Sequence, residues 1–295
     1  MAKGKVIVTG ANGQLGVDLV KTLKGLGYEV YGMGREELDF SYAEQVDWAF
    51  RRIRPDVVIH AGAYTKVDQA EKEPAEAFRV NGFGTRHVAS AAEEVGAKLV
   101  YVSTDYVFDG ESGEPYGEEA LTNPLNVYGQ TKLAGEKFVR AVHSRSFIVR
   151  TSWVFGAHGP NFVKTMLRLG AERDTVSVVG DQIGCPTYTV DLANCIARLI
   201  ETESYGTYHV SNTDSCSWYE FAQRIFDKAG TPVRVEPITT AEFPRPAKRP
   251  AHSVLEHGML RKNGFPDLRS WREALDAFFE ELLAEAEQAP VTRSS

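Results

Sequence analysis

Tyr128 and Lys132 are two side chains whose types and spacing suit proton transfer. They are four positions apart, a spacing that places both on one face of a helix. A tyrosine hydroxyl has a pKa near ~10 and is a poor acid or base at neutral pH, but a nearby ammonium stabilises the phenolate and lowers that pKa. The pair therefore predicts a proton-transfer site in which Lys132 lowers the pKa of Tyr128. The alternative is a solvated helix face with one stacked aromatic ring.

Thr104 and Asp105 follow an apolar run at 99–103. Such a run predicts a buried strand. Open α/β sheets bind their ligands beyond the carboxyl ends of the strands. The sequence therefore places the Thr104 hydroxyl at a ligand-binding edge.

The N-terminus supplies a second indication. Residues 5–9 are short, apolar and β-branched, and they lead into Gly10, Gly13 and Gly16. A helix face follows, marked by Leu15, Leu19 and Leu23. A strand, a glycine turn and a helix form the setting of a dinucleotide site: Gly10 permits the turn, Gly13 lets backbone N–H groups approach a pyrophosphate, and Gly16 lets helix and strand pack closely. The alternative is a glycine-rich turn that binds no ligand.

Composition limits the class of protein. The 295 residues are 43% hydrophobic and 25% charged, as in globular proteins. The net charge of −7 argues against a nucleic-acid partner. The three cysteines form no C-x-x-C pair, which predicts a reducing cytoplasmic location. No apolar run is long enough for a membrane span, and no His/Cys cluster has zinc spacing.

Strand-like and helix-like segments alternate along the first half of the chain. Strands are predicted at residues 5–9, 28–33, 37–40, 56–60, 99–103 and 147–151. This alternation predicts an α/β fold with a doubly wound parallel sheet of the Rossmann type. Residues 1–152 are the expected dinucleotide-binding domain, with some later elements interleaved.

Beyond Trp153, glycines and prolines interrupt the alternation, so residues 153–288 are the expected, mainly substrate-binding domain. Helices are predicted at 162–169, 190–201, 218–229 and 270–288, a strand at 206–210, and a disordered tail at 289–295.

The end of the second strand bears on the cofactor. An acidic residue there suits NAD, whereas an Arg suits the 2′-phosphate of NADP. Here the strand ends at Gly34-Arg35, so we predict that NADPH is preferred and NADH is the lesser alternative. Arg35 could instead be a plain surface residue. Asp39 and Phe40, on the expected third strand, would meet the adenine. An alternative is that Asp39 or Ser41 caps a helix.

The glycine spacing, together with Thr104, Tyr128 and Lys132, resembles the extended branch of the short-chain dehydrogenase/reductase superfamily. Longer blocks are similar to the dTDP-4-dehydrorhamnose reductase family, at residues 103–110, 123–136, 150–156 and 180–187. The resemblance extends to about Leu255. It implies that the second, smaller domain interleaves with the first.

The resemblance also implies roles for individual residues. The catalytic set would be Thr104, Tyr128 and Lys132. The cofactor set would be Gly10, Gly13, Gln14, Leu15, Gly16, Arg35, Asp39, Phe40, Ala63, Tyr64, Thr65 and Val102, with Tyr128 and Lys132. The substrate set would be Thr104, Asp105, Trp153 and Arg249. Arg249 lies in a proline-rich segment that could equally be a surface linker.

Two further side chains are expected to be structural. His60 follows an apolar run, so a hydrogen-bonded core histidine is favoured over a ligand. Asn81 is expected to bind backbone groups beneath the site.

The reaction implied is reduction of the 4-keto group of dTDP-4-dehydro-6-deoxy-L-mannose (dTDP-4-dehydrorhamnose) by NADPH or NADH, giving dTDP-L-rhamnose for cell-surface polysaccharide. The expected partner is this nucleotide-sugar, and the protein is expected to be a monomer or homodimer. Some relatives form metal-bridged dimers, so Mg²⁺ is a possibility there, but no carboxylate cluster in this sequence predicts a metal site.

Three other functions stay open at this point. A 4,6-dehydratase carries an Asp-Glu pair after the Thr, whereas Tyr106 follows Asp105 here. An epimerase would return the hydride to its product. The regulatory subunit of methionine adenosyltransferase is similar to this family and acts as a non-catalytic binding partner.

Overall fold

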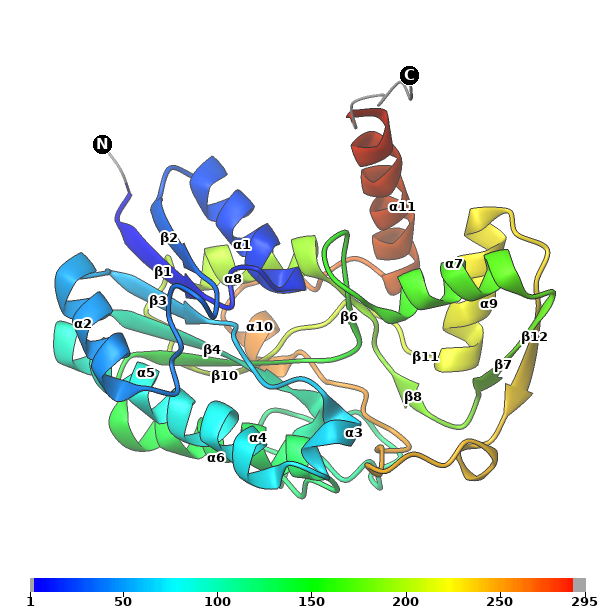
Figure 1. Ribbon diagram of the computed structural model, residues 1–295, viewed down its shortest axis with the longest axis horizontal. Coiled ribbons are helices and arrows are strands. Elements are labelled where there is room, and N and C mark those ends of the chain that lie inside the picture. Colours follow the sequence, from blue (N-terminus) through cyan, green and yellow to red (C-terminus); the bar gives the residue numbers. More distant parts are fainter. Residues whose placement is uncertain (1–2, 289–295) are drawn as a thin grey trace.

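The computed structural model describes residues 3–288, and its centre is a six-stranded sheet (Figure 1). The strand order is β10-β5-β4-β3-β1-β2, and every pairing is parallel. The strands are β1 (Lys5–Thr9), β2 (Glu29–Met33), β3 (Val57–His60), β4 (Lys98–Thr104), β5 (Ser146–Thr151) and β10 (Gly206–His209). The predicted parallel sheet of the Rossmann type is confirmed.

Helices cover both faces of this sheet (Figure 1). One face packs against α1 (Gln14–Gly25), α8 (Thr189–Leu199) and α10 (Gly258–Lys262). The other packs against α2 (Ala43–Ile53), α5 (Thr85–Val95) and α6 (Val127–Val142). The central strands read as continuous apolar runs because both of their faces are buried.

Short helical turns connect these layers near the carboxyl edge of the sheet. They are α3 (Val67–Ala70), α4 (Pro74–Phe78), the π-helical turn η1 (Arg79–Gly84) and the 3₁₀ turn η2 (Asp105–Val107). Helix α6 begins at a side-chain cap, because Asn126 Oδ1 accepts a hydrogen bond of 2.8 Å from the Gly129 N–H. This cap fixes the first turn of α6, which carries Tyr128.

A second lobe has its own core. Its helices are α7 (Phe162–Glu172), α9 (Trp218–Ala229) and α11 (Trp271–Gln288), and a small 3₁₀ turn η3 covers Thr240–Glu242. Its strands pair two by two: β6 (Val154–Phe155) with β9 (Thr187–Tyr188), β8 (Ile183–Gly184) with β11 (Cys216–Ser217), and β7 (Thr175–Val179) with β12 (Arg234–Ile238). Buried rings fill its centre, including Phe155, Phe221, Trp271 and Phe278. The helices expected at 162–169, 190–201, 218–229 and 270–288 are all present.

The two lobes are built from interleaved segments. After β9 the chain returns to the sheet, where α8 packs along α1 and β10 pairs with β5. A later segment adds α10 beside β10. A unit cut at residue 152 therefore lacks three elements that pack with the sheet.

The prediction of a strand at residues 37–40 is wrong. This segment is a turn in which side chains bind nearby backbone groups. The Glu37 carboxylate accepts a hydrogen bond from the Gly34 N–H (2.9 Å), and Asp39 Oδ1 accepts one from the Ser41 N–H (3.0 Å). Such local bonds compete with a strand ladder. Helix α2 begins after this turn, and neither Asp39 nor Ser41 caps it.

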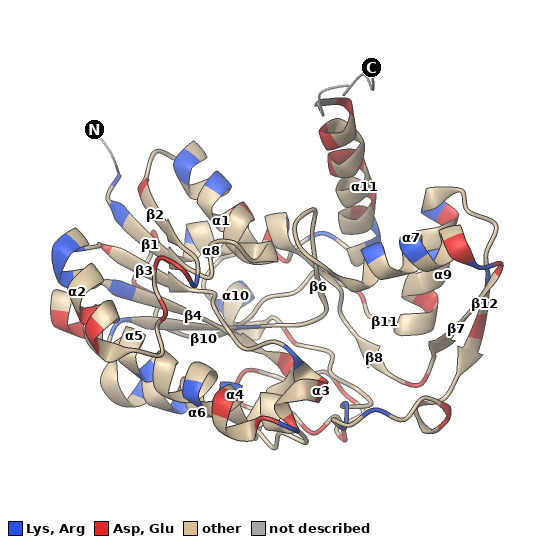
Figure 2. Cartoon of the chain, in the orientation of Figure 1, with Lys and Arg blue, Asp and Glu red and all other residues tan. Residues whose placement is uncertain are grey.

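Acidic and basic residues are mixed along the chain in the view of Figure 2. Helices such as α2 and α7 each carry both acidic and basic residues (Figure 2). Within residues 3–288, no helix combines the length and apolar character needed to cross a bilayer. The tail expected at 289–295 lies outside the described residues.

Candidate active site

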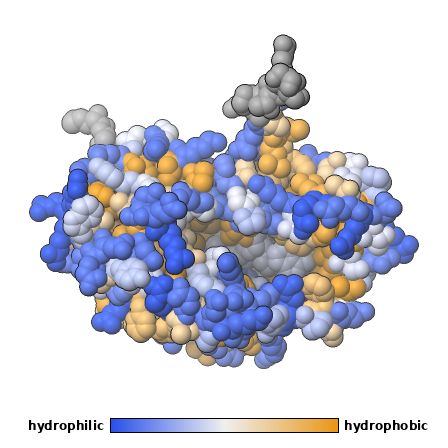
Figure 3. Space-filling view, viewed as in Figure 1, coloured by the Kyte–Doolittle hydropathy of each residue, from blue (hydrophilic) through white to orange (hydrophobic). Residues whose placement is uncertain are grey.

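A cleft of about 640 Å³ lies at the carboxyl edge of the sheet. Figure 3 shows the molecule hollowed between the sheet lobe and the second lobe. Its walls come from the glycine turn, from the ends of β3, β4 and β5, from the start of α6, and from the segment after β5. A neighbouring hollow of about 430 Å³ shares Gly10, Arg35, Ala63 and Thr65 with it. The two hollows form one long site.

The glycine turn leads from β1 into α1 and can hold a diphosphate. Gly10 has φ +68°, and a Cβ there would lie 2.6 Å from the Cα of Gly62. A Cβ on Gly16 would lie 2.1 Å from the Gly10 carbonyl oxygen. The first N–H groups of a helix have no acceptor within it and attract anions. Gly13, Gln14 and Leu15 at this helix start all line the cleft, so the residues fit a dinucleotide.

The second hollow collects the rest of the expected cofactor set. It is lined by Arg35, Asp39, Phe40, Ala63, Tyr64 and Thr65. The side chain of Arg35 is 77% exposed and lies 3.6 Å from the Asp39 carboxylate. Asn81 holds the Tyr64 backbone from beneath, since its Oδ1 accepts from Tyr64 N–H (2.7 Å) and its Nδ2 donates to Tyr64 O (3.1 Å). The structural role expected of Asn81 is confirmed.

His60 is the last residue of β3. Its Nδ1 lies 2.7 Å from Thr9 Oγ1 and its Nε2 lies 3.1 Å from Thr85 Oγ1. Burial lowers the pKa of His60 to about 3, and the Lys132 charge adds to this effect. The expectation of a hydrogen-bonded core histidine is confirmed.

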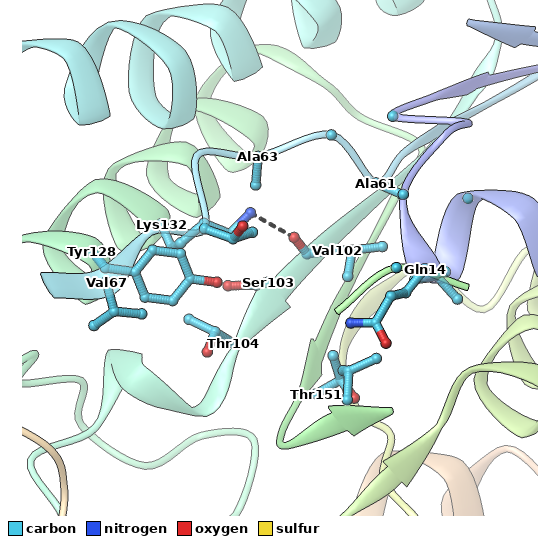
Figure 4. Close-up of a pocket in the computed structure, with 18 of the residues that line it drawn as sticks. Gln14, Ala61, Ala63, Val67, Val102, Ser103, Thr104, Tyr128, Lys132 and Thr151 are labelled. Atoms are coloured by element: carbon cyan, nitrogen blue, oxygen red, sulfur yellow. Dashed lines mark hydrogen bonds between the residues drawn. The ribbon is translucent and has the colours of Figure 1, made fainter. Parts of the chain in front are cut away.

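Tyr128 and Thr104 meet in the cleft. Figure 4 shows the Tyr128 ring, from α6, directed toward the Ser103–Thr104 end of β4. Burial, and next the charge of Asp105, raise the pKa of Tyr128 above its usual range, while contact with Thr104 opposes this. We expected the opposite shift. Burial disfavours the phenolate more than any nearby charge stabilises it.

Lys132 lies one turn further along α6. Its Nζ donates a hydrogen bond of 2.7 Å to the Val102 carbonyl (Figure 4) and sits 4.2 Å from the centre of the Tyr101 ring. Burial lowers the pKa of Lys132 to about 7, although the charge of Glu136 raises it. The ammonium is therefore held against the wall of β4.

A buried ion pair lies directly beneath these groups. Glu136, on α6, accepts from Arg150 Nε (2.9 Å) and Nη2 (2.8 Å) and from Ser103 Oγ (2.6 Å). Ser103 and Arg150 are register partners on β4 and β5, one residue before Thr104 and Thr151. The pair therefore joins α6 to two strands just below the cleft.

Trp153 forms part of the wall of the cleft. It has φ +46°, which is unusual for a residue with a side chain. Its ring stacks on Trp218 at 3.4 Å between centroids and 6° between planes. A Cβ on Gly184 would lie 2.5 Å from Trp153 Cε2. Trp218 and Gly184 thus hold the Trp153 ring in place.

Comparisons with known proteins identify the family of this chain. A family model described as the RmlD substrate binding domain matches residues 4–284.

The chain belongs to this RmlD family.

Named relatives match nearly the full length. A Streptomyces griseus protein named dTDP-4-dehydrorhamnose reductase is 46% identical over 287 residues, covering 95% of this chain and 94% of its own. A Streptomyces niveus protein named dTDP-4-keto-6-deoxy-D-glucose reductase is 40% identical over 275 residues, covering 92% and 96%. A crystal structure of dTDP-4-dehydrorhamnose reductase from Bacillus anthracis, in complex with NADP, has a TM-score of 0.93 and 53% identity, covering 95% and 100%.

Of the substrate residues expected in this RmlD-family chain, only Arg249 stands apart from the cleft lining. Its Nη1 lies 2.5 Å from Asp68 Oδ1, and Arg245 binds the other oxygen of the same carboxylate. The two guanidinium groups, with Arg249 first, hold the pKa of Asp68 well below its usual range. The proline-rich segment is thereby tied to α3.

Three features of this RmlD-family site were missed from the sequence. They are Trp218 behind Trp153, the Glu136–Arg150 pair and the Asp68–Arg249 pair. Only Glu136 carried a local signal, because it follows Lys132 by four positions and so shares its helix face. The other contacts join residues far apart in the chain.

Proposed function

We propose that this protein is an NADPH-dependent reductase of the 4-keto group of dTDP-4-dehydrorhamnose, giving dTDP-L-rhamnose. The observation that carries the proposal is the meeting of Tyr128 and Thr104 beside a glycine-cradled helix start within one cleft. The names of the relatives and the NADP complex of a protein 53% identical support it.

Tyr128 is the proposed proton donor. Its raised pKa keeps the hydroxyl protonated at neutral pH but makes it a weak acid. The proposal therefore requires the positive charge of Lys132 to stabilise the phenolate as the proton leaves. Thr104, at the end of β4, lies beside it and would hydrogen-bond the same ketone oxygen as negative charge develops there. Bound NADPH would supply the hydride to the ketone carbon.

Lys132 and Val102 are the proposed contacts of the cofactor's nicotinamide half. The Lys132 ammonium is held at the end of β4 by the Val102 carbonyl. From there it can donate hydrogen bonds and place positive charge near the developing phenolate. The glycine turn would hold the diphosphate, and Ala63, Tyr64 and Thr65 the ribose next to it.

Trp153 and Asp105 are the proposed walls of the sugar subsite, since both line the cleft near Tyr128. Arg249 is proposed to bind the substrate diphosphate, for which a guanidinium is well shaped. It would have to exchange its bond to Asp68 for one to phosphate.

The test follows NADPH absorbance with purified protein and dTDP-4-dehydrorhamnose. We expect stoichiometric oxidation of NADPH, and Tyr128→Phe should lower kcat by about 10²–10⁴-fold with NADPH affinity retained. Tyr31→Phe, on β2 outside both hollows, is the matched control. Equal turnover by Tyr128→Phe and wild type would remove Tyr128 from the mechanism.

Arg35 is the proposed reason for a preference for NADPH. It lines both hollows, and its guanidinium is free enough to meet a 2′-phosphate. Arg35→Ala should raise the KM for NADPH about tenfold and leave that for NADH nearly unchanged. Arg52→Ala, on α2, is the control. Equal effects on the two cofactors would contradict the preference.

A second substrate is favoured by one relative. The Streptomyces niveus protein is named a dTDP-4-keto-6-deoxy-D-glucose reductase, so that ketone belongs in the same assay. An epimerase would show no net NADPH oxidation with either sugar. We propose a cytoplasmic enzyme without nucleic-acid or membrane partners, a monomer or homodimer, which size-exclusion chromatography with light scattering distinguishes.

A further inference from the structure

We propose that Asp105 is a positioning residue: its neutral carboxyl donates a hydrogen bond to Thr104 Oγ1 and so frees the Thr104 proton for the ketone oxygen. This inference rests on the proposed reductase function. It assigns Asp105 a task that acts through Thr104 and differs from holding a sugar hydroxyl.

The hydrogen bonds of Thr104 decide where its single hydroxyl proton points. A hydroxyl has one proton to donate and two lone pairs that accept. Thr104 Oγ1 accepts from the Tyr106 N–H at 3.2 Å and lies 2.9 Å from Asp105 Oδ1. If Asp105 is ionised, the only proton of Thr104 must point at the carboxylate. A lone pair then faces the cleft, and it would repel a developing oxyanion.

A neutral carboxyl reverses this bond. The Asp105 O–H donates to Thr104 Oγ1, which then accepts from both Asp105 and Tyr106. The Thr104 proton is released toward the cleft, where it can stabilise the oxyanion. The oxygen–oxygen distance of 2.9 Å fits either direction, because hydrogen positions are set by the surroundings.

The surroundings of Asp105 make its ionised form more costly than that of an exposed aspartate. The residue is 2% exposed, and its buried Oδ2 has no hydrogen-bond partner among residues 3–288. An ionised oxygen in that state is costly. Burial raises the pKa of Asp105 to about 6, against opposing contributions from Ser253 and Thr104. Ser253 lies near Asp105, but its hydroxyl does not reach hydrogen-bond geometry with Oδ2.

The titratable groups around Asp105 do not offset this burial. Tyr128 faces it from α6, Tyr106 from the same turn, and Cys185 from the segment before β9. Burial raises the pKa of all three, so they are neutral near pH 7. Arg249 lies beside Tyr106, but its charge is already paired with Asp68.

The proposal predicts a pH dependence of definite sign. The competent form carries a proton on Asp105, so kcat should be high below the Asp105 pKa and fall as the pH rises through it. Asp105→Asn places an amide N–H₂ group where the acid proton was, and an amide does not titrate. Its kcat should therefore lose this dependence between about pH 5 and about pH 8.

Three variants test the idea under saturating NADPH and sugar. Asp105→Asn should turn over at least about tenfold faster than Asp105→Leu, which offers Thr104 no donor. Asp109→Asn alters a nearby carboxylate outside the cleft. Its kcat should fall with rising pH as that of the wild type does. If Asp105→Asn is as slow as Asp105→Leu, or if its kcat still falls with rising pH as in the wild type, the ionised carboxylate is the working form and the proposal is overturned.

A readout without turnover separates this proposal from the reductase function. The wild-type minus Asp105→Asn infrared difference spectrum should show the C=O stretch of a protonated acid at about pH 5, disappearing toward about pH 8. Its absence at the lower pH overturns the proposal even if the enzyme is active. If the band is present but no sugar is reduced, the reductase function has failed and the proton arrangement on Asp105 stands.

Discussion

Lys132 carries its amine where burial opposes charge. The side chain is 2% exposed, and its one hydrogen bond in the described part of the chain goes to the Val102 carbonyl. Glu136, which shares its helix face, is already bound by Arg150. The lysine therefore gains little from that carboxylate. Burial is the main reason that its pKa lies near 7.

This shift predicts how stability depends on pH. The pKa of Lys132 is about 7 when folded and about 10.5 when exposed, so between these values the unfolded chain binds the extra proton. Stability of the wild type should thus rise with pH in that window, relative to Lys132→Met. Urea unfolding at about pH 7 and about pH 9 measures the difference. If the stability of both proteins changes equally between these pH values, the pKa of Lys132 is not lowered in the folded protein.

The residues that sequence could identify are those whose partners are local. Tyr128 and Lys132 share a helix face by spacing alone, and Thr104 ends its strand by composition alone. Arg150 was not identifiable as a partner of Glu136, because their contact depends on the register of β4 with β5. The shift of the Tyr128 pKa was also misjudged, since burial is a property of the whole cleft.

The glycines between β1 and α1 have no side chains, and this allows α1 to pack closely against the turn that follows β1. Gly16 lies on its first turn and packs on the Gly10 carbonyl and on Ala11. Gly25, at the end of the same helix, has open space where a Cβ would go. The two glycines therefore offer the same substitution with opposite consequences.

We expect Gly16→Ala to destabilise the protein by about 1–3 kcal/mol, because the added carbon forces α1 away from the turn. NADPH binding should weaken as well, since the helix start moves with it. Gly25→Ala should change stability by about 0.5 kcal/mol in the favourable direction and leave binding as it was. Thermal unfolding and NADPH titration of both variants provide the check. Similar losses in both would point to a general weakness of α1.

The elements predicted from sequence were those with a strong apolar period. Residues 5–9 and 99–103 are buried on both faces and were predicted as strands. The prediction for segment 37–40 failed, because Glu37 and Asp39 bind backbone within the turn and no strand among residues 3–288 pairs with it. Short alternating segments do not reveal whether such a partner exists.

At the scale of the molecule, two lobes enclose the cleft, and one of them is assembled from both halves of the sequence. The sheet lobe takes β1–β5 from the first half and α8, β10 and α10 from the second. We propose that the dinucleotide-binding unit comprises all of these and does not end at residue 152. Composition alone placed its boundary where the regular alternation stopped.

A fragment of residues 1–152 should therefore fail to bind NADPH. It exposes the edge of β5 and the face of α1 that α8 covers in the full chain. Unpaired strand edges and apolar faces favour aggregation. A chain ending at residue 288 serves as the control and should bind as the full protein does. Size-exclusion chromatography and NADPH fluorescence distinguish the two, and a monomeric, NADPH-binding fragment would contradict the proposed unit.

The late arrival of β10 also has a consequence for synthesis. On the ribosome, the first five strands emerge well before Gly206–His209 can close the edge of β5. Parallel pairing between distant segments is slow, and open strand edges are where newly made chains associate wrongly. The nascent protein thus passes through a long interval with one edge unprotected. Holding chaperones, if they bind it during translation, should do so at β5 and should be released once α10 has emerged.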